Sequence, residues 1–445
     1  MTSGIAADFL ESLGERPVWP PATVDELRAA FGGPLPQGPM EAREVVAGLA
    51  EAASGGLVAE PGGRYFGFVI GGSVPAALAA DWLTSTWDQN AGLYVCSPAG
   101  SVVEEVAGAW LLELLGLPAT ASVGFVTGCQ MAHVTALAAA RSHLLHGAGW
   151  DLAHDGLYGA PRIRVVAGAK RHGTLDRALR LLGMGEPELV PADDQGRLLV
   201  DALELDDRPT VVCAQVGEVN TGACDDVAAV ADRTQGSGAW LHVDGAFGLW
   251  AAVSPSLRHL TRGVERADSW ATDAHKWLNV PYDSGLVFCA RPEAHRAAMG
   301  SRAEYLIFDE DKRDQLNWNP EHSRRARGFP IYAAIRSLGQ QGIAEMVERA
   351  CAHARRFASE LSGLGAEIVN DVVLNQVLFR FETDQQTAAV LAGVQASGEA
   401  WMSGTTWDGR AAIRLSVSNW QTTNADIDRT VAAFRAAVAE PVRAG

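Results

Sequence analysis

Two charged residues in the middle of the chain have the types and the placement needed for covalent chemistry. Asp244 lies in His-Val-Asp-Gly-Ala (242–246), and Lys276 lies in Asp-Ala-His-Lys-Trp-Leu (273–278). Partly apolar surroundings are expected to lower the pKa of Lys276, so that its neutral amine can form an imine with an aldehyde. An aspartate at the end of an apolar strand can hold the positive charge of a ring nitrogen. Pyridoxal 5′-phosphate requires both groups, so the pair predicts a site for that cofactor.

The phosphate of such a cofactor needs an anion site, and one glycine-containing turn is a candidate. Segment 124–130 leads through Gly128, Cys129 and Gln130 into a helix expected to start near Met131. Glycine lets the backbone approach an anion closely, and the free amides of a helix start favour negative charge. The same pattern also occurs as a plain helix cap without a ligand.

Three further residues are candidates for contacts with the ring. His172 follows the apolar run 163–168, where its imidazole can stack on one ring face, while the small Ala246 leaves room on the other. Asn220 follows the run 210–216 and is a candidate to hydrogen-bond the ring hydroxyl or to support Asp244 and His172. The simpler alternatives, a solvated or capping histidine and a glycine-ended turn, stay open.

The bulk composition is that of a globular enzyme. Of the 445 residues, 48% are hydrophobic and 20% are charged, which allows a large core and excludes general disorder. The formal net charge of −17 makes nucleic acid and anionic membranes unfavourable partners. The sequence has no uninterrupted apolar run of about 18 residues, so we expect no membrane span.

The cysteines and the first residues bear on the cellular compartment. Six cysteines, at positions 96, 129, 213, 224, 289 and 351, are scattered without a Cys-x-x-Cys pair. This usage is typical of reduced thiols and suggests neither a disulfide framework nor a zinc site, so we expect no metal. The first ten residues lack the basic segment and apolar run of a signal peptide. These features predict a cytoplasmic protein.

The pattern of apolar runs divides the chain into three parts. Residues 1–90 carry short helical patterns between Pro- and Gly-rich breaks, and we expect them to pack on another domain or on a dimer partner. In residues 91–330, β-branched apolar runs alternate with helical stretches, which predicts an α/β domain with a mostly parallel central sheet and helices on both faces. Residues 331–445 are typical of a small C-terminal α+β domain. Ligands of such a sheet bind at the carboxyl ends of its strands, where Asp244 and Lys276 fall.

The individual elements are expected as follows. Strands are predicted at 163–168, 210–216, 239–244, 285–289, 374–382 and 410–418, and helices at 131–147, 174–183, 225–234, 331–363 and 424–439. Thr423 or Asn424 is available to cap the last helix.

Several motifs are shared with one known family. His-Val-Asp-Gly-Ala (242–246) is followed by His-Lys-Trp (275–277), and further motifs are Glu-Arg-Pro-Val (15–18), Tyr-Phe-Gly-Phe (65–68), Ser-Pro-Ala (97–99) and Arg-Leu-Ser-Val-Ser-Asn (414–419). Together they resemble the pyridoxal-phosphate-dependent group II amino acid decarboxylases, which include the aromatic amino acid, glutamate and cysteine sulfinate decarboxylases. The resemblance implies the fold type I of the pyridoxal-phosphate-dependent transferases and an interlocked homodimer.

The resemblance also implies roles for single residues. Lys276 would hold the cofactor as an aldimine, and Asp244 would keep the ring nitrogen protonated. His172 would stack on the ring, and Ala246 would lie beneath it. Tyr305, in a polar stretch beyond Lys276, is similar to the family's mobile-loop tyrosine and would protonate the α-carbon after carbon dioxide leaves. Packing at an interface is the alternative role for Tyr305.

For the phosphate, the resemblance implies His275 and backbone amides from residues 128–131. The chain departs from many relatives at this turn, where it has Cys129 and Gln130 in place of small hydroxyl or alanine residues. It also has Asp273 where the aromatic enzymes tend to have asparagine. A carboxylate near a phosphate is unfavourable unless a donor lies between them or the carboxylate is protonated.

The substrate pocket is expected, by the same resemblance, around Phe66, Phe68, Asn90 and Tyr94. No basic residue stands out there to bind a side-chain carboxylate. This favours an aromatic or other apolar L-amino acid, converted to its amine and carbon dioxide. Ordinary core packing of these aromatic residues is the alternative.

Three other functions stay open. The first is decarboxylation of an acidic amino acid such as glutamate. The second is transamination, for which Arg410 or Arg414 is a candidate to clamp the substrate carboxylate. The third is a non-catalytic homologue that keeps the fold for binding or assembly.

Overall fold

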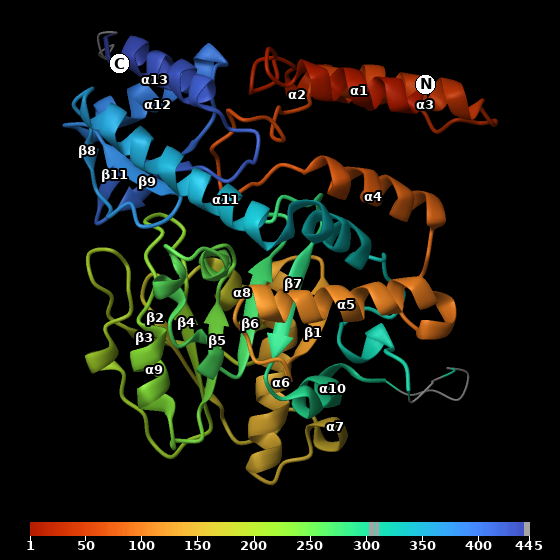
Figure 1. The fold of residues 1–445 in the computed structure, drawn as a ribbon, viewed down its shortest axis with the longest axis vertical. Helices are drawn as coiled ribbons and strands as arrows, with labels where there is room; N and C mark the ends of the chain where they lie inside the picture. The colour runs from red at the N-terminus through yellow and green to blue at the C-terminus, as the bar shows by residue number, and fades with distance from the viewer. Residues whose placement is uncertain (302–306, 308–310, 440–445) are drawn as a thin grey trace.

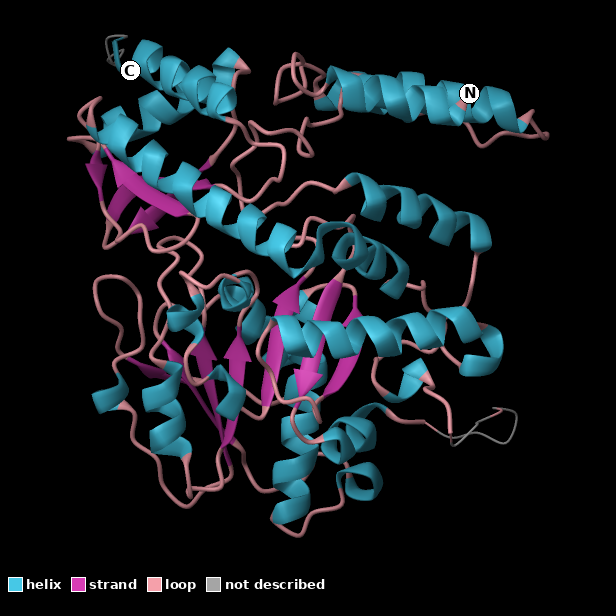
Figure 2. Cartoon of the chain, in the orientation of Figure 1, coloured by secondary structure: helices cyan, strands magenta, loops and turns pink. Residues whose placement is uncertain are grey.

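The computed structural model describes residues 1–301, 307 and 311–439 of the protein (Figures 1 and 2). The α-helices are α1 (Thr2–Ser12), α2 (Val24–Phe31), α3 (Ala42–Ser54), α4 (Pro75–Trp87), α5 (Pro98–Leu114), α6 (Cys129–Gly147), α7 (Leu152–Asp155), α8 (Gly173–Leu181), α9 (Val227–Thr234), α10 (Pro292–Met299), α11 (Gly328–Ser362), α12 (Asp384–Ser397) and α13 (Asn424–Ala439). The strands are β1 (Ser122–Val126), β2 (Arg164–Gly168), β3 (Glu188–Val190), β4 (Thr210–Gln215), β5 (Trp240–Asp244), β6 (Ser269–Asp273), β7 (Gly285–Cys289), β8 (Glu367–Ile368), β9 (Gln376–Arg380), β10 (Ser403–Trp407) and β11 (Arg410–Ser416). Short 3₁₀ helices are η1 (Tyr94–Cys96), η2 (Val200–Ala202), η3 (Gly248–Val253), η4 (Arg258–Thr261), η5 (Val264–Arg266) and η6 (Gln315–Asn317).

The central sheet has seven strands in the order β1-β7-β6-β5-β4-β2-β3. Strand β7 runs antiparallel to both of its neighbours, β1 and β6, and the other pairs are parallel. The inner strands β4 to β7 are almost wholly buried, which explains why they are apolar on both faces. The prediction of a mostly parallel, doubly covered sheet is confirmed.

Helices cover both faces of this sheet, and β5 shows how the faces are divided. Leu241 and Val243 belong to the core that also contains residues of α5, α9 and α11. Trp240, His242 and Asp244 point to the other face, where α6 packs on β5, β6 and β7. Because strand side chains alternate between faces, every second residue of β5 meets α6.

Strands β1 and β6 were not predicted. Both mix small or polar residues with apolar ones, as in Ser-Val-Gly-Phe-Val (122–126) and Ser-Trp-Ala-Thr-Asp (269–273). Both are nevertheless fully buried, because neighbouring strands satisfy their polar groups: Ser122 donates to the Cys289 carbonyl, and Ser269 accepts from the Trp240 indole. An apolar-run criterion therefore misses them.

The C-terminal part forms a separate antiparallel sheet in the order β10-β11-β9-β8. The long helix predicted at 331–363 is α11, which begins at Gly328 and is interrupted at Gly339, where φ is 61°. The last helix is α13 as predicted, and Thr423 caps it by accepting from the Asp426 amide at 3.3 Å. The two sheets lie within the spans 91–330 and 331–445, whose boundaries stay predictions.

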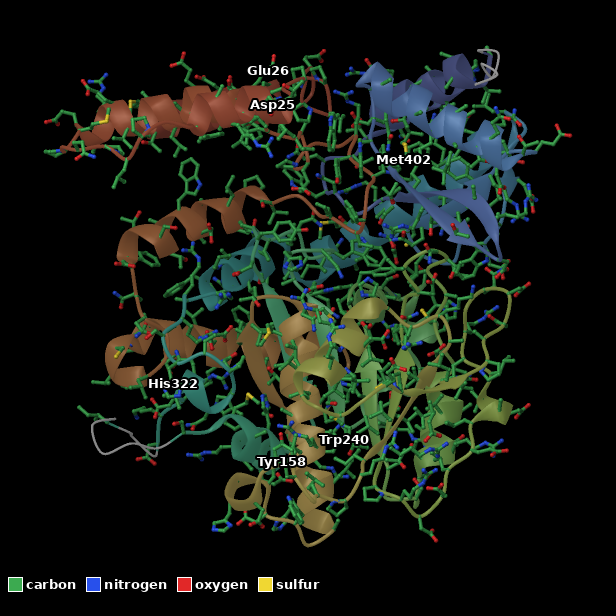
Figure 3. All side chains as sticks on the ribbon, turned by 180° about the vertical axis from the view of Figure 1, so that it is seen from behind. Asp25, Glu26, Tyr158, Trp240, His322 and Met402 are labelled. Carbon is green, nitrogen blue, oxygen red and sulfur yellow. The ribbon has the colours of Figure 1, made fainter. Side chains whose placement is uncertain are left out.

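The N-terminal helices contribute little to the core of this chain. Helices α1, α2 and α3 contain no buried residue, and they lie beyond α4 on the side away from the central sheet (Figures 1 and 3). Helix α4 packs on α11, yet Trp82, Leu83 and Trp87 remain 45 to 47% exposed. Among the described residues, no helix combines the length and the apolar character needed to cross a membrane.

A buried histidine makes the stability of this fold sensitive to acid. His295 of α10 bonds from Nδ1 to the Ser122 hydroxyl at 2.9 Å and from Nε2 to the Trp318 carbonyl at 3.1 Å. Burial, together with the charge of Arg313, lowers the pKa of His295 to about 3. Since the unfolded chain takes up the proton near pH 6.5, stability from this group is complete above that pH and is lost as pH falls.

We therefore expect His295→Gln to weaken the pH dependence of unfolding. Between pH 7 and pH 5 the wild type should lose about 2 kcal/mol more of its unfolding free energy than the variant, measured by urea denaturation. His154→Gln, at a histidine whose side chain is 83% exposed, is the matched control and should behave as the wild type. Equal pH dependence in wild type and His295→Gln would contradict the prediction.

Candidate active site

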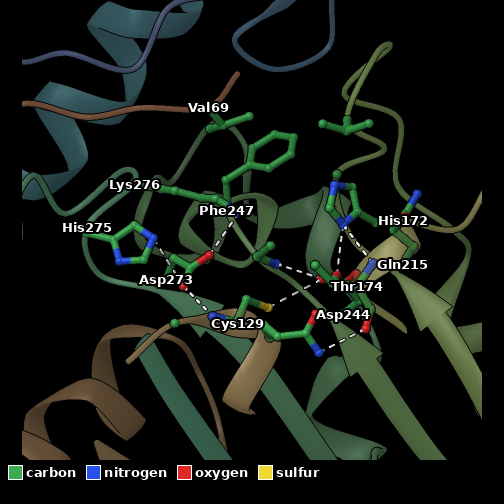
Figure 4. Close-up of a pocket in the computed structure, with 15 residues that line it drawn as sticks. Val69, Cys129, His172, Thr174, Gln215, Asp244, Phe247, Asp273, His275 and Lys276 are labelled. Atoms are coloured by element: carbon green, nitrogen blue, oxygen red, sulfur yellow. Dashed lines mark hydrogen bonds and ion pairs between the residues drawn. The ribbon is translucent and has the colours of Figure 1, made fainter. Parts of the chain in front are cut away.

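A cavity of about 240 Å³ lies at the carboxyl ends of β4, β5 and β6, against the first turn of α6 (Figure 4). It is lined by Val69, Gly128, Cys129, Gln130, His172, Thr174, Gln215, Gly217, Val219, Asp244, Ala246, Phe247, Asp273, His275 and Lys276. The cavity thus brings together nine residues that were predicted from the sequence to bind one cofactor. They come from four separate stretches of the chain.

Lys276 forms an ion pair across this cavity. Its Nζ lies 2.8 Å from Oδ2 of Asp273, the last residue of β6. Burial alone would lower the pKa of Lys276, but nearby negative charge, chiefly that of Asp273, outweighs burial and raises the pKa. The expectation of a lowered pKa was therefore wrong, because the apolar surroundings were inferred without this partner. The amine must lose its proton before it can act as a nucleophile.

Asp273 is surrounded by donors as well as by the lysine. Its Oδ1 accepts the backbone N–H of Cys129 at 2.6 Å and lies 3.5 Å from Nε2 of His275. Of the amides expected to hold a phosphate, that of Cys129 is therefore already bonded to a carboxylate. The close approach of α6 to β7 depends on Gly285, where a Cβ atom would overlap the backbone of Gly128. The position tolerates no larger residue.

Asp244 is a buried carboxylate at the end of β5. Its Oδ2 lies 3.4 Å from Nε2 of His133, and its Oδ1 accepts from the Ala246 amide at 3.1 Å. Burial alone would raise the pKa of Asp244, but His133, with smaller contributions from His172 and Lys276, holds the pKa well below its usual range. The residue is therefore an anion at neutral pH.

Cys129 and Asp244, which line the cavity, form a cluster with His133 behind them. Each of Cys129, His133 and Asp244 offers one atom that could bind a metal ion, and these three atoms lie within 4.8 Å of one another. Burial, followed by the charges of Asp244 and Asp273, raises the pKa of the thiol well above its usual value. Cys129 is therefore a neutral thiol, a weak donor to Asp244 Oδ1 at 3.8 Å.

His172 caps α8 and lines the cavity at the same time. Its Nδ1 accepts from the Thr174 amide at 3.3 Å and lies 2.8 Å from the Thr174 hydroxyl, as Figure 4 shows. Gln130 donates to the Thr174 carbonyl at 3.2 Å, which ties α6 to this turn. Desolvation by the cavity wall lowers the pKa of His172, although Asp244 opposes the shift. The ring is therefore a neutral group with its Nε2–H free to face the cavity.

Five predicted residues do not line the cavity. Phe66 is 1% exposed and packs against Phe357, so it is a core residue; Phe68 is 55% exposed on the surface. The Asn220 side chain donates to Glu218 at 2.8 Å and accepts from Thr405, so its polar groups are used elsewhere.

The other two lie near segment 314–324. Asn90 is exposed and accepts from the Arg324 amide at 3.2 Å, and the amide of Tyr94 donates to Asp314 at 2.8 Å. The predicted catalytic residue Tyr305 lies outside the described residues.

Sequence reasoning missed His133 and His242, which stand directly behind Asp244. His133 lies one helical turn after Cys129, and His242 lies two residues before Asp244, so each shares a face with a residue that was singled out. That periodicity was a usable signal. The apolar lining residues, such as Val69 and Phe247, carried no comparable signal, because such residues line cores and cavities alike.

We expect Asp273→Asn to lower the pKa of Lys276, because it removes the paired negative charge. The asparagine Oδ1 still accepts the Cys129 amide, so the turn should stay in place. The pH dependence of lysine acylation in the cofactor-free protein, followed at Lys276 by peptide mass spectrometry, measures the shift.

The matched control is Asp408→Asn, which removes the surface partner of Lys170 at 3.2 Å. Solvent screens that pair, so the reactivity of Lys170 should change little. An unchanged profile of Lys276 in Asp273→Asn would show that Asp273 does not set its protonation.

Comparison with known proteins places this site in a family. Residues 61–382 match the family model of the pyridoxal-dependent decarboxylase conserved domain. The chain is 28% identical to tryptophan decarboxylase 1 of Oryza sativa subsp. japonica, with 93% of this chain and 87% of the relative covered. It is also 28% identical to acidic amino acid decarboxylase GADL1 of Bos taurus, with 67% of this chain and 59% of the relative covered.

The fold is also similar to that of solved decarboxylases. The crystal structure of Oryza sativa TDC with PLP and tryptamine superposes with a TM-score of 0.92 at 23% identity, covering 99% of this chain and 97% of that chain. The family match spans well over half of the sequence and includes both Asp244 and Lys276. The chain therefore belongs to the pyridoxal-dependent decarboxylase family: it is a pyridoxal 5′-phosphate-dependent amino acid decarboxylase, a carboxy-lyase.

Proposed function

We propose that the cavity beside α6 holds pyridoxal 5′-phosphate and that the enzyme converts an aromatic or other apolar L-amino acid to its amine and carbon dioxide. One observation carries the proposal. The amine of Lys276 and the anionic carboxylate of Asp244, which suit the aldehyde and the ring nitrogen of the cofactor, line the same cavity.

The remaining walls fit the cofactor as well. The N-terminus of α6 opens onto the cavity and favours an anion. At Gly128 a Cβ atom would lie 3.3 Å from His275 and 3.5 Å from Asp273, so the absent side chain keeps this corner open. His275 and Gln130 are the side chains available beside the phosphate, and both line the cavity.

When bound, the cofactor supplies an electron sink for the bond that breaks at the substrate's α-carbon. The chain's residues do the rest. Lys276 would bind the aldehyde, and Asp244 would keep a positive charge on the ring nitrogen. His172 and Ala246 would lie against the ring. By the family resemblance alone, Tyr305 would return a proton to the α-carbon.

The lining of the cavity supports an apolar substrate side chain. Val69, Val219 and Phe247 supply apolar surface, and no lining residue that the structure describes is an arginine. Arg414 lies behind the wall and donates to the Val219 carbonyl at 2.8 Å, while Arg410 donates to the Glu382 carbonyl at 2.9 Å. Neither arginine lines the cavity, which argues against transamination and against an acidic side chain.

The substrate proposal has a direct test. Purified enzyme with added cofactor is incubated with equimolar L-amino acids, and the products are identified by mass spectrometry. Amines from tryptophan, tyrosine, phenylalanine, leucine or valine are expected. Products from glutamate or cysteine sulfinate would support the acidic alternative, as the likeness to GADL1 does. A 2-oxo acid would indicate transamination. No product would indicate either a substrate outside the tested set or a non-catalytic homologue.

Lys276→Ala tests the covalent role. The variant should lack the visible absorbance of lysine-bound cofactor and should release carbon dioxide at least about a hundredfold more slowly than the wild type. Lys170→Ala, at a lysine paired with Asp408 on the surface, is the matched control and should keep both properties. Retained absorbance in Lys276→Ala would exclude this lysine as the anchor.

We also propose that the enzyme is a homodimer, with α1 to α4 forming much of the shared surface. These helices, together with the segment between α1 and α2, carry exposed Trp19, Phe31, Leu49 and Trp82, which is more apolar surface than a monomer normally leaves in water. The six cysteines are all free thiols, which supports a cytoplasmic location.

The dimer proposal predicts a particle of twice 47.1 kDa by size-exclusion chromatography with light scattering. Trp82→Glu would bury a charge in the interface and should shift the particle to the monomer mass. Leu181→Glu, at a 62% exposed leucine of α8, is the matched control and should stay dimeric. A wild-type monomer at micromolar concentration would contradict the proposal.

A further inference from the structure

A line of hydrogen bonds runs through the sheet to the back of Asp244. Nε1 of Trp240 donates to Oγ of Ser269 at 2.8 Å, and that hydroxyl lies 2.9 Å from Nδ1 of His242. Nε2 of His242 lies 2.9 Å from Nδ1 of His133, whose Nε2 faces Asp244 at 3.4 Å. The linking residues His242, His133 and Ser269 are 0% exposed, so the line is closed to solvent at its far end.

The positions of the hydrogens follow from the donors that are fixed. The indole of Trp240 can only donate, so the Ser269 oxygen accepts and its O–H points to Nδ1 of His242. His242 then carries its proton on Nε2 and donates to Nδ1 of His133. His133 in turn carries its proton on Nε2, where it meets the carboxylate of Asp244. In this arrangement every donor along the line faces an acceptor.

The reverse arrangement, in which every hydrogen bond of the line points away from Asp244, is unfavourable at both ends. It would turn the lone pair of His133 Nε2 against the anionic Asp244, with only the Cys129 thiol, a weak donor 3.5 Å away, to compensate. It would also make His242 donate to Ser269, whose hydroxyl proton has no other acceptor among the described residues. Burial, aided by His133, lowers the pKa of His242 to about 3, so His242 stays neutral. The line therefore has one stable direction, which ends on Asp244.

We infer that His133, oriented by His242 and Ser269, is a positioning residue that holds Asp244 as an anion turned toward the ring nitrogen of the cofactor. The inference rests on the proposed role of Asp244 and extends it through the sheet. His133 faces Oδ2 of Asp244, while the amide of Ala246 and the thiol of Cys129 donate to Oδ1 of the same carboxylate. His172 and Lys276 are the other charged or titratable groups that act on this carboxylate from the cavity side.

A pair of ligands isolates this effect from general damage to the pocket. The dissociation constants of pyridoxal 5′-phosphate and of its 1-deaza analogue, in which carbon replaces the ring nitrogen, are measured with cofactor-free protein by tryptophan fluorescence. The analogue keeps the aldehyde and the phosphate but offers nothing to Asp244. The ratio of the two constants therefore reports the contact between the ring nitrogen and Asp244.

His133→Phe should reduce the preference for the natural cofactor about tenfold, because the carboxylate loses a donor to a charged group. His133→Gln, whose amide can reach the place of Nε2, should restore much of the preference. Ser269→Ala should weaken it in the same direction, although Ser269 lies two histidines away from Asp244. His295→Gln replaces another histidine that is 0% exposed and is the matched control, which should leave the ratio unchanged.

The possible outcomes distinguish the role of His133 from the role of Asp244. Equal weakening of both ligands in His133→Phe, or an unchanged ratio, would overturn the role of His133 while Asp244 keeps its own. A wild type that binds both ligands equally would overturn the role of Asp244 and the inference with it. If His133→Phe fails to fold, Ser269→Ala and His133→Gln still decide, because an unchanged ratio in Ser269→Ala contradicts a line of oriented hydrogen bonds.

Discussion

Two carboxylates stand at the ends of neighbouring buried strands, and the site depends on keeping both of them charged. Asp244 ends β5 and Asp273 ends β6, and like charges in a poorly solvated place repel strongly. Each is stabilised by donors that come from another element. Lys276 and the first amide of α6 serve Asp273, and His133 of α6 serves Asp244. The position of α6 is thereby set by charge as well as by packing.

The sequence of α6 suits a helix that must bring donors to the ends of β5 and β6. Cys129 and His133 lie one turn apart on the face that meets β5, while the rest of the buried face is mostly alanine and leucine. Small residues let the helix lie close to the sheet, and Gly285 removes the side chain that would keep β7 away from the turn at Gly128. The same close contact that covers the sheet therefore brings the polar groups into range of the strand ends.

Function follows from how these charges are distributed. Lys276, held protonated by Asp273, and Asp244, held ionised by His133, lie in one cavity whose other walls are largely apolar. In the proposed site, a cofactor that brings an aldehyde, a ring nitrogen and a phosphate would find a complement for each group. Among the described residues that line the cavity there is no arginine, and the one lysine is paired with Asp273.

The sequence by itself determined the α/β class, the small C-terminal domain and nine residues of the cavity. The fold class and seven of these residues depend on local patterns: apolar runs set strands, and the residues after parallel strands meet at one edge of the sheet. His275 and Asp273 came from the family resemblance instead. Only the tertiary structure decided the protonation of Lys276, the burial of Phe66 in the core and the use of Asn220 by Glu218 and Thr405. The contact between His133 and His242 likewise joins residues that are 109 positions apart. Such contacts depend on how whole elements dock, and no local pattern records that.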